Sequence, residues 1–245
     1  MNLVAIDIGT TRIKCGRFEG ETLKETWHYA TKDSASIGGD LLARVGKDKL
    51  AMSSVAPNAT ADIEKAIGRP IFKVTPGGQN FIKDFHPEYG ADRVADTVAA
   101  RQFYAPNKNL AVIAMGTCTV LTTVLANGVV AGGFITLGFH RMVSELHVAS
   151  PLIEAVREAN YKKYALDFGF TTHDQIVNGS AVGQIGIVQS WLELTRKKLG
   201  GPLVTVATGG NAALLMNEGG SSDIVDHIDQ HLTINGIRLI ASAAR

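Results

Sequence analysis

Apolar and polar positions in the first hundred residues alternate in short runs that predict strands first and helices later. Three runs separated by turn residues predict an antiparallel meander, and two further apolar runs predict buried strands. The five strands are expected at 2–7, 12–18, 23–31, 50–55 and 70–74. Helices are expected over 37–45, from a cap at Asn58 onward, and over 90–104.

The rest of the chain repeats this order of elements. Asn127-Gly128 is a strong hairpin signal between two of the strands. Strands are expected at 110–114, 117–125, 128–136, 203–207 and near 222–225. Helices are expected at 138–148, 150–162, 173–199, 210–216 and 233–243. Such a repeat predicts two related halves that meet near Pro106-Asn107.

This order is the one found in domains of the actin, Hsp70 and sugar-kinase type. We therefore expect an α/β protein with duplicated actin/ribonuclease-H-like domains, residues 1–106 and 107–245. Each domain would hold a mixed five-stranded sheet flanked by helices, and the active site would lie in the cleft between the domains.

Composition limits the function without identifying it. The 245 residues are 45% hydrophobic and 19% charged, which is typical of a compact protein with a substantial core. A net charge of +1 favours neither a nucleic-acid partner nor a membrane surface. The sequence shows no leader and no long apolar run, and its two cysteines, Cys15 and Cys118, predict no disulfide framework. We expect a cytoplasmic protein.

The first candidate site follows the first strand, in the segment DIGTTRIK. Gly9 lets the backbone approach a ligand and present N–H groups, while Thr10 and Thr11 add hydroxyl donors. Lys14 adds a mobile positive charge, and Asp7 could hold a magnesium ion that bridges phosphate oxygens. The segment therefore predicts a phosphate-binding hairpin, although an ordinary tight turn has the same local pattern.

A second hairpin of this kind strengthens the prediction. Gly116, Thr117 and Thr119 follow the apolar strand at 110–114 and lead into another strand. Both hairpins would contact the phosphates of ATP. A third glycine-containing turn, at Gly209-Gly210, could pack against an adenine ring or merely reverse the chain.

Asp92 is expected in the first turn of a helix, where the helix dipole favours the ionised carboxylate. It could serve as a general base toward a substrate hydroxyl that attacks a phosphoryl group, or simply begin the helix. Arg93 could hold a carboxylate or phosphate in a bidentate pair. Thr171 or Thr172 would ordinarily cap the long helix that follows.

Other chemistries lack their sequence signals. The chain has no paired histidines or cysteines at zinc-ligand spacing, no GxSxG motif, no P-loop and no GxGxxG after its first strand. A zinc enzyme, a serine hydrolase, a P-loop nucleotidase and a Rossmann dehydrogenase are therefore not predicted.

Six segments in order resemble the type III pantothenate kinases: DIGTTRIK, SSVAP, PEYGADR, GTCT, GGFITLG and ATGGNA. The resemblance covers nearly the whole chain. It implies an enzyme that phosphorylates pantothenate with ATP in the first step of coenzyme A synthesis, as a homodimer that needs Mg²⁺ and a monovalent cation.

The resemblance also implies residue roles. Asp92 matches the catalytic aspartate of the family, and Asp7 is the implied magnesium ligand. The residues matched to substrate binding are Tyr89, Gly90, Ala91, Arg93 and Thr172. The residues matched to ATP binding are Asp7, Gly9, Thr10, Thr11, Lys14, Gly116, Thr117, Thr119, Gly209 and Gly210.

Two neutral residues depart from the family pattern in the second phosphate motif. Ala114 and Thr122 stand where the family usually has aspartates, and the first of those aspartates is associated with the monovalent cation. Alanine removes an oxygen ligand, so dependence on K⁺ or NH₄⁺ is expected to be altered or absent. Three interpretations remain: an active pantothenate kinase, a nucleotide-binding relative without turnover, and a kinase for another small hydroxylated molecule.

Overall fold

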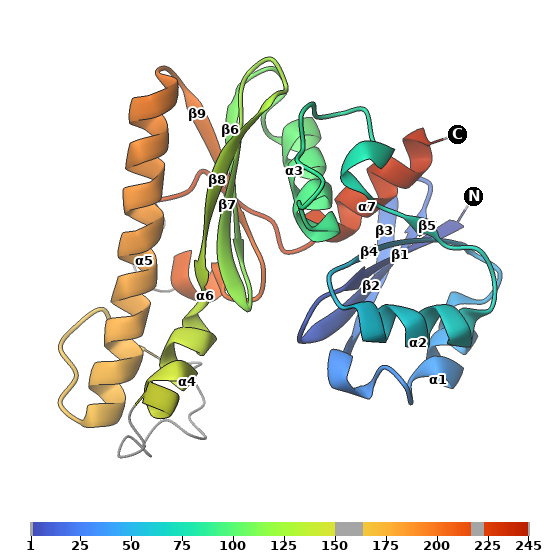
Figure 1. Cartoon of the computed structure of the whole chain (residues 1–245), viewed down its shortest axis with the longest axis horizontal. Coiled ribbons are helices and arrows are strands. Elements are labelled where there is room, and N and C mark those ends of the chain that lie inside the picture. The colour runs from blue at the N-terminus through green and yellow to red at the C-terminus, as the bar shows by residue number, and fades with distance from the viewer. Residues whose placement is uncertain (1, 150–163, 217–222, 245) are drawn as a thin grey trace. The chain divides into compact units, whose positions relative to one another are not determined.

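The computed structural model describes residues 2–149, 164–216 and 223–244, which form two compact units (Figure 1). The first unit comprises Met1–Phe103, Gly128–Val130 and His231–Arg245, and the second comprises Tyr104–Asn127 and Ala131–Gln230. The helix expected over 150–162 lies outside the described residues.

The first unit contains a five-stranded sheet with the order β3-β2-β1-β4-β5. The first three strands pair antiparallel, and β4 and β5 continue the sheet in parallel with β1. The strands are β1 (Asn2–Ile8), β2 (Arg12–Glu19), β3 (Thr22–Ala30), β4 (Lys49–Ser54) and β5 (Phe72–Lys73). The helical segments are η1 (Thr31–Asp33), α1 (Gly38–Val45), α2 (Pro57–Ile67), η2 (Pro76–Gly78), α3 (Ala91–Phe103) and α7 (Leu232–Ala243).

The second unit repeats this topology, because its sheet has the order β10-β9-β6-β7-β8. The central strand β6 pairs antiparallel with β7 and parallel with β9. The strands are β6 (Asn109–Met115), β7 (Cys118–Val124), β8 (Val130–Leu137), β9 (Leu203–Thr208) and β10 (His227–Ile228). The helices are α4 (Phe139–Ala149), α5 (Thr172–Leu199) and α6 (Ala212–Met216). The predicted duplication of a mixed five-stranded sheet is confirmed.

Two element boundaries differ from the predictions. Helix α2 begins at Pro57 rather than after a cap at Asn58, because proline suits the first helical position, where an N–H has no partner. The last strand lies at 227–228 rather than near 222–225. Asp226, which directly precedes this strand, fixes the position of the strand. Its carboxylate accepts hydrogen bonds from the Thr205 N–H at 2.7 Å and from the Thr205 hydroxyl at 2.8 Å.

The final helix, α7, belongs to the first unit, which differs from the division expected at residue 106. Gly236 lets α7 approach α3 closely, since a β-carbon there would overlap the Ala95 carbonyl group. The Thr233 hydroxyl also donates to Asp96 of α3 at 2.6 Å. The chain therefore returns to its first unit after completing the second.

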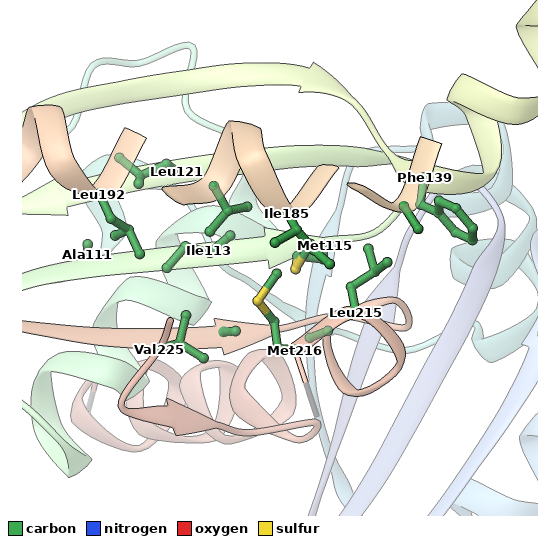
Figure 2. Packing of buried hydrophobic residues seen from close by; sticks show 14 of the residues in the cluster. Ala111, Ile113, Met115, Leu121, Phe139, Ile185, Leu192, Leu215, Met216 and Val225 are labelled. Atoms are coloured by element: carbon green, nitrogen blue, oxygen red, sulfur yellow. The ribbon is translucent and has the colours of Figure 1, made fainter. Parts of the chain in front are cut away.

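Each unit has its own apolar core. In the second unit, residues of β6, β7, α5 and α6 pack together, as Figure 2 shows for Ile113, Leu121, Ile185 and Leu215. In the first unit, β1 and β2 pack against α1 and α2. No helix within the described residues has the length and apolar character to span a bilayer.

Candidate active site

Asp7 is the penultimate residue of β1, and the neighbouring strands bring two polar side chains beside it. Lys14 of β2 pairs with it on one side and Ser53 of β4 on the other. The Ser53 hydroxyl donates to Asp7 Oδ1 at 2.7 Å. Burial raises the pKa of Asp7 to about 6, and the charge of Asp92 adds to the rise, while Ser53 and Lys14 oppose it. A bound cation would therefore stabilise the ionised carboxylate.

The turn that follows β1 is held in shape from two sides. The Gly9 N–H donates to the Arg12 carbonyl at 3.0 Å. Thr31 donates its hydroxyl to Gly9 O at 2.7 Å and its N–H to Thr11 O at 3.0 Å. Thr10 and Thr11 are exposed at the tip of this turn. Gly9, Thr10 and Thr11 thus lie on one supported surface loop, and Lys14 follows the loop in β2.

Asp92 lies in the first turn of α3, directly after Ala91. Its Oδ1 accepts the N–H of Arg93 at 2.8 Å. Gly90 leaves room for this carboxylate, since a β-carbon at Gly90 would lie 2.5 Å from Asp92 Oδ1. Because the Asp92 charge contributes to the raised pKa of Asp7, the fold brings the two predicted carboxylates into one electrostatic environment.

Arg93 is oriented by its neighbours in the preceding loop. Its guanidinium lies 4.4 Å from the ring centroid of Tyr89, which is a cation–π geometry. Its Nη2 donates to the Glu88 carbonyl at 3.3 Å, and Phe85 contacts Tyr89 edge-on. The predicted substrate-binding residues from Tyr89 to Arg93 therefore form one contiguous group around Asp92.

The turn between β6 and β7 is fixed through its carbonyl groups. The Asn211 N–H donates to Met115 O at 3.0 Å, and its side-chain amide donates to Gly116 O at 3.2 Å. The Gly138 N–H donates to Thr117 O at 2.9 Å. With three successive carbonyls held by flanking loops, the backbone of the second hairpin has a defined conformation.

Thr119, a predicted phosphate contact, has a hydrogen-bond partner in the interior. It is fully buried, and its hydroxyl donates to Gln184 Oε1 at 2.5 Å. Thr117 is half-buried and Cys118 is exposed. Thr119 therefore supports the hairpin from the interior, because β-strand residues alternate between the two faces of the sheet.

The two glycines after β9 have different surroundings. Gly209 has a φ of +97°, and a β-carbon there would lie 2.5 Å from Met115 O, so this position requires glycine. A β-carbon at Gly210 would meet no atom within 4 Å. Gly209 is needed for the close approach of two backbones, whereas Gly210 leaves space that a ligand could use.

Thr172 is the first residue of α5, and its neighbour Thr171 is the N-cap. The Thr171 hydroxyl accepts the Asp174 N–H at 3.1 Å, and the Asp174 carboxylate accepts the Thr171 N–H at 3.4 Å. Thr172 is exposed and lies in the second unit, whereas the other predicted substrate-binding residues lie in the first.

Residues without a predicted role also build the site. Ser53 belongs to the segment SSVAP, but its contact with Asp7 depends on strand pairing. Asp96 lies one helical turn beyond Asp92, is buried, and accepts the Thr233 hydroxyl. Burial raises the pKa of Asp96 well above the usual range. The spacing of four residues on a helix was a usable signal for Asp96.

Asp7 is the predicted magnesium ligand of the site. Within the described ranges, no group of three or more His, Cys, Asp or Glu side chains could hold a metal ion. Asp7 fits Mg²⁺ differently, since this ion is often held by one carboxylate together with substrate phosphates. In the second unit, Ala114 pairs with Val120 and Thr208, and neither neighbour carries a carboxylate.

Solved structures with the same fold include nucleotide-binding proteins. A ROK family glucokinase from Streptomyces griseus, in complex with glucose and AMPPNP, superposes with a TM-score of 0.57 at 15% identity, covering 100% of this chain and 99% of the other. An archaeal actin homologue gives a TM-score of 0.56 at 12% identity, covering 100% of both chains. At this identity the likeness shows the actin-like fold alone.

Sequence comparison is more specific. A protein from Dehalococcoides mccartyi named type III pantothenate kinase is 32% identical over 260 residues, covering 97% of this chain and 96% of the relative. A protein of the same name from Anaeromyxobacter is 33% identical, covering 97% of this chain and 98% of the relative. The family model described as type III pantothenate kinase matches residues 3–193. The chain therefore belongs to the type III pantothenate kinase family.

Proposed function

We propose that this protein transfers a phosphoryl group from ATP to pantothenate, giving 4′-phosphopantothenate in the first step of coenzyme A synthesis. The observation that carries the proposal is membership of the type III pantothenate kinase family, with Asp7 and Asp92 both held by hydrogen bonds in the first unit. Family membership supports the substrate, and the two carboxylates support the chemistry.

Asp92 is the proposed general base. The pantothenate hydroxyl oxygen forms a bond to the γ-phosphorus while its proton passes to the Asp92 carboxylate, and the bond from the γ-phosphorus to the bridging oxygen breaks to release ADP. Arg93, oriented by Tyr89, is proposed to hold the pantothenate carboxylate. Gly90, which leaves room for the Asp92 carboxylate, and Ala91 are proposed to contact the substrate beside this pair. Most of the rate acceleration in such a transfer comes from positioning and charge neutralisation.

In the first unit, Gly9, Thr10, Thr11 and Lys14 are proposed to contact the ATP phosphates. Asp7 would hold Mg²⁺, and the Ser53 hydroxyl would orient its carboxylate by donating to Oδ1. The bound ion would neutralise phosphate charge.

In the second unit, the proposed ATP contacts are Gly116, Thr117, Gly209 and Gly210, while Thr119 holds the hairpin in place. A monovalent cation such as K⁺ is proposed to have little effect, because Ala114 supplies no side-chain oxygen as a ligand.

The test is ATP-dependent phosphorylation of pantothenate by the purified protein, with Mg²⁺ and with K⁺, NH₄⁺ or Na⁺ at equal ionic strength. Turnover that does not require K⁺ supports the proposal. Nucleotide binding without transfer would favour a non-catalytic relative. Turnover of other hydroxylated acceptors in preference to pantothenate would favour a kinase of different specificity.

A homodimer is proposed from exposed apolar residues of the second unit. Phe168 and Phe170 are 100% and 96% exposed, and Ile135 on the edge strand β8 is 60% exposed. Exposed large apolar side chains are common at protein interfaces. Sedimentation velocity is expected to give a dimer for the wild type and monomers for a Phe168→Ser/Phe170→Ser variant. Leu42→Ser, which removes a 44% exposed side chain from the first unit, should leave the dimer intact.

The cytoplasm is the proposed location. The two cysteines of the protein, Cys15 and Cys118, are both free thiols, which suits a reducing compartment. Cell fractionation with a marker enzyme for each compartment tests this placement, and recovery outside the cytoplasmic fraction would contradict it.

A further inference from the structure

A buried amide supports the second hairpin from the side facing the core. Gln184 lies in the middle of α5 and is fully buried. Its Oε1 accepts the Thr119 hydroxyl at 2.5 Å. Its Nε2 donates to the Leu137 carbonyl at 2.8 Å and to Met142 Sδ at 2.8 Å. One side chain thus joins β7, the end of β8 and α4.

We infer that Gln184 is a positioning residue for ATP, which sets the place of the β6–β7 turn without touching the nucleotide. The inference rests on the proposed role of Gly116 and Thr117 in binding the ATP phosphates. It assigns to the middle of α5 a function that depends on a tertiary contact rather than on a phosphate-binding motif.

The hydrogen bonds of Gln184 reach the turn by two routes, through Thr119 and through Leu137. Thr119 lies two residues after Thr117, so its hydroxyl fixes the start of β7. Leu137 directly precedes Gly138, whose N–H donates to Thr117 O at 2.9 Å. A β-carbon at Gly138 would overlap the Gly116 carbonyl, so the two segments are in close contact. A shift of Leu137 would therefore be passed directly to the turn.

The polar character of Gln184 is costly in its surroundings. The buried neighbours of Gln184 on α5 include the apolar Ala181 and Ile185 as well as the polar Ser180. Ile185 packs in the same cluster as Met115 (Figure 2). A buried amide is tolerated when its donors and acceptor are satisfied, and an apolar side chain would fill this space at less cost. The presence of the amide is explained by the positions in which it holds Thr119 and Leu137.

The first test is Gln184→Met, which keeps the length and burial of the side chain but removes the amide. We expect kcat/KM for ATP to fall about 10- to 100-fold, since small displacements at a reacting centre have effects of this size. The KM for pantothenate should change much less. Thr119→Val removes the partner hydroxyl with little change in shape and should reproduce the effect, and the double variant should be no worse than either single variant.

Thr119→Ser retains the hydroxyl and is expected to preserve ATP use. The matched control is Thr195→Val, which removes a buried hydroxyl of α5, the helix that carries Gln184; this hydroxyl donates to the Trp191 carbonyl at 2.8 Å. Thermal unfolding of each variant separates lost stability from lost positioning. Should Gln184→Met fail to fold, Thr119→Val and Thr119→Ser carry the test alone.

Unchanged kcat/KM for ATP in Gln184→Met or Thr119→Val would overturn the inference, as would an equal loss in Thr195→Val. Thr117→Ala separates this result from a failure of the proposed function. If Thr117→Ala weakens ATP use and Gln184→Met does not, the hairpin binds ATP and the inference about Gln184 is wrong. If the wild type transfers phosphate but Thr117→Ala has no effect, the proposed role of the hairpin is wrong.

Discussion

Strand β1 of the first unit and strand β6 of the second occupy the same place in two sheets of the same strand order, and a hairpin turn follows each. The penultimate residue is Asp7 in β1 and Ala114 in β6. The turns differ in length as well, because the first spans 9–12 and the second 116–118. Equivalent backbone positions thus carry a carboxylate in one unit and a methyl group in the other.

The strand neighbours of Asp7 also include a charged residue, which the strand neighbours of Ala114 do not. Lys14 is the antiparallel partner of Asp7, whereas Val120 is the partner of Ala114. On the parallel side, Ser53 donates to Asp7, while Thr208 lies opposite Ala114 with no carboxylate to receive its hydroxyl. The second hairpin therefore presents backbone and hydroxyl groups where the first also presents charge.

This difference shows which features of a duplicated fold are set by backbone geometry and which by chemistry. Burial raises the pKa of Asp7 to about 6, which corresponds to roughly 3 kcal/mol of destabilisation of the ionised form. A buried carboxylate is expected at a position where a bound cation or a proton offsets this destabilisation. The proposed chemistry therefore belongs to the first unit, and the second contributes positioning.

The largest expected effect tests whether the chemistry resides in the first unit. Asp92→Asn should lower kcat by ~10²–10⁴ with little change in ATP binding, because an amide cannot accept the substrate proton. Steady-state kinetics and nucleotide titration measure the two quantities. Asp40→Asn, in the first turn of α1, changes a helix-start carboxylate elsewhere and should retain turnover. Normal kcat in Asp92→Asn would remove this residue from the mechanism.

Asp7 should give the first unit a pH dependence that the second lacks. Below about pH 6 the Asp7 carboxyl is protonated and cannot ligate Mg²⁺, and above it the carboxylate is available. We expect kcat/KM to rise with pH through about 6, and higher Mg²⁺ should shift the rise to lower pH. Asp7→Asn should lower kcat/KM and remove this titration. A flat wild-type profile across this region would contradict the assigned role.

The same raised pKa predicts a trend in stability without ligand. Unfolded Asp7 ionises near its ordinary value of 3.8, while the folded residue retains its proton up to about 6. The contribution of Asp7 to the free energy of unfolding therefore falls as pH rises between these values. Urea unfolding of the wild type and Asp7→Asn over this range measures the difference in unfolding free energy, which should become independent of pH at pH values well below 3.8.

The support of the second hairpin can be tested with two adjacent glycines. Gly209→Ala should reduce stability by ~1–3 kcal/mol, because its positive φ and the nearby Met115 carbonyl exclude a β-carbon. Gly210→Ala, which meets no atom, should leave the unfolding temperature unchanged and raise KM for ATP. Thermal unfolding and ATP kinetics of both variants give the comparison. Equal stability of the two variants would show that the turn can relax.

The smallest expected effect comes from making the two hairpins more alike. Ala114→Asp places a carboxylate at the position equivalent to Asp7, and we expect K⁺ to stimulate turnover of this variant by a few-fold. Na⁺ at equal ionic strength controls for screening. No change in the response to K⁺ would mean that the missing carboxylate is not what determines cation dependence.

The sequence by itself determined the repeated element order, the two glycine-containing turns and the place of Asp92 at a helix start. These features depend on local periodicity and turn residues, which act over a few positions. The predicted meander and the hairpin at Asn127-Gly128 belong to the same class. Such signals can be recognised in the sequence without knowing which distant segments come into contact.

Only the tertiary structure decided which distant residues complete the site. Thr119 and Gln184 are 65 positions apart, and Asp7 and Ser53 are 46 apart, so no local pattern specifies either pair. The return of α7 to the first unit likewise depends on its close packing with α3 through Gly236. Long-range contacts are selected by the burial and shape of the whole core, which the sequence encodes jointly rather than position by position.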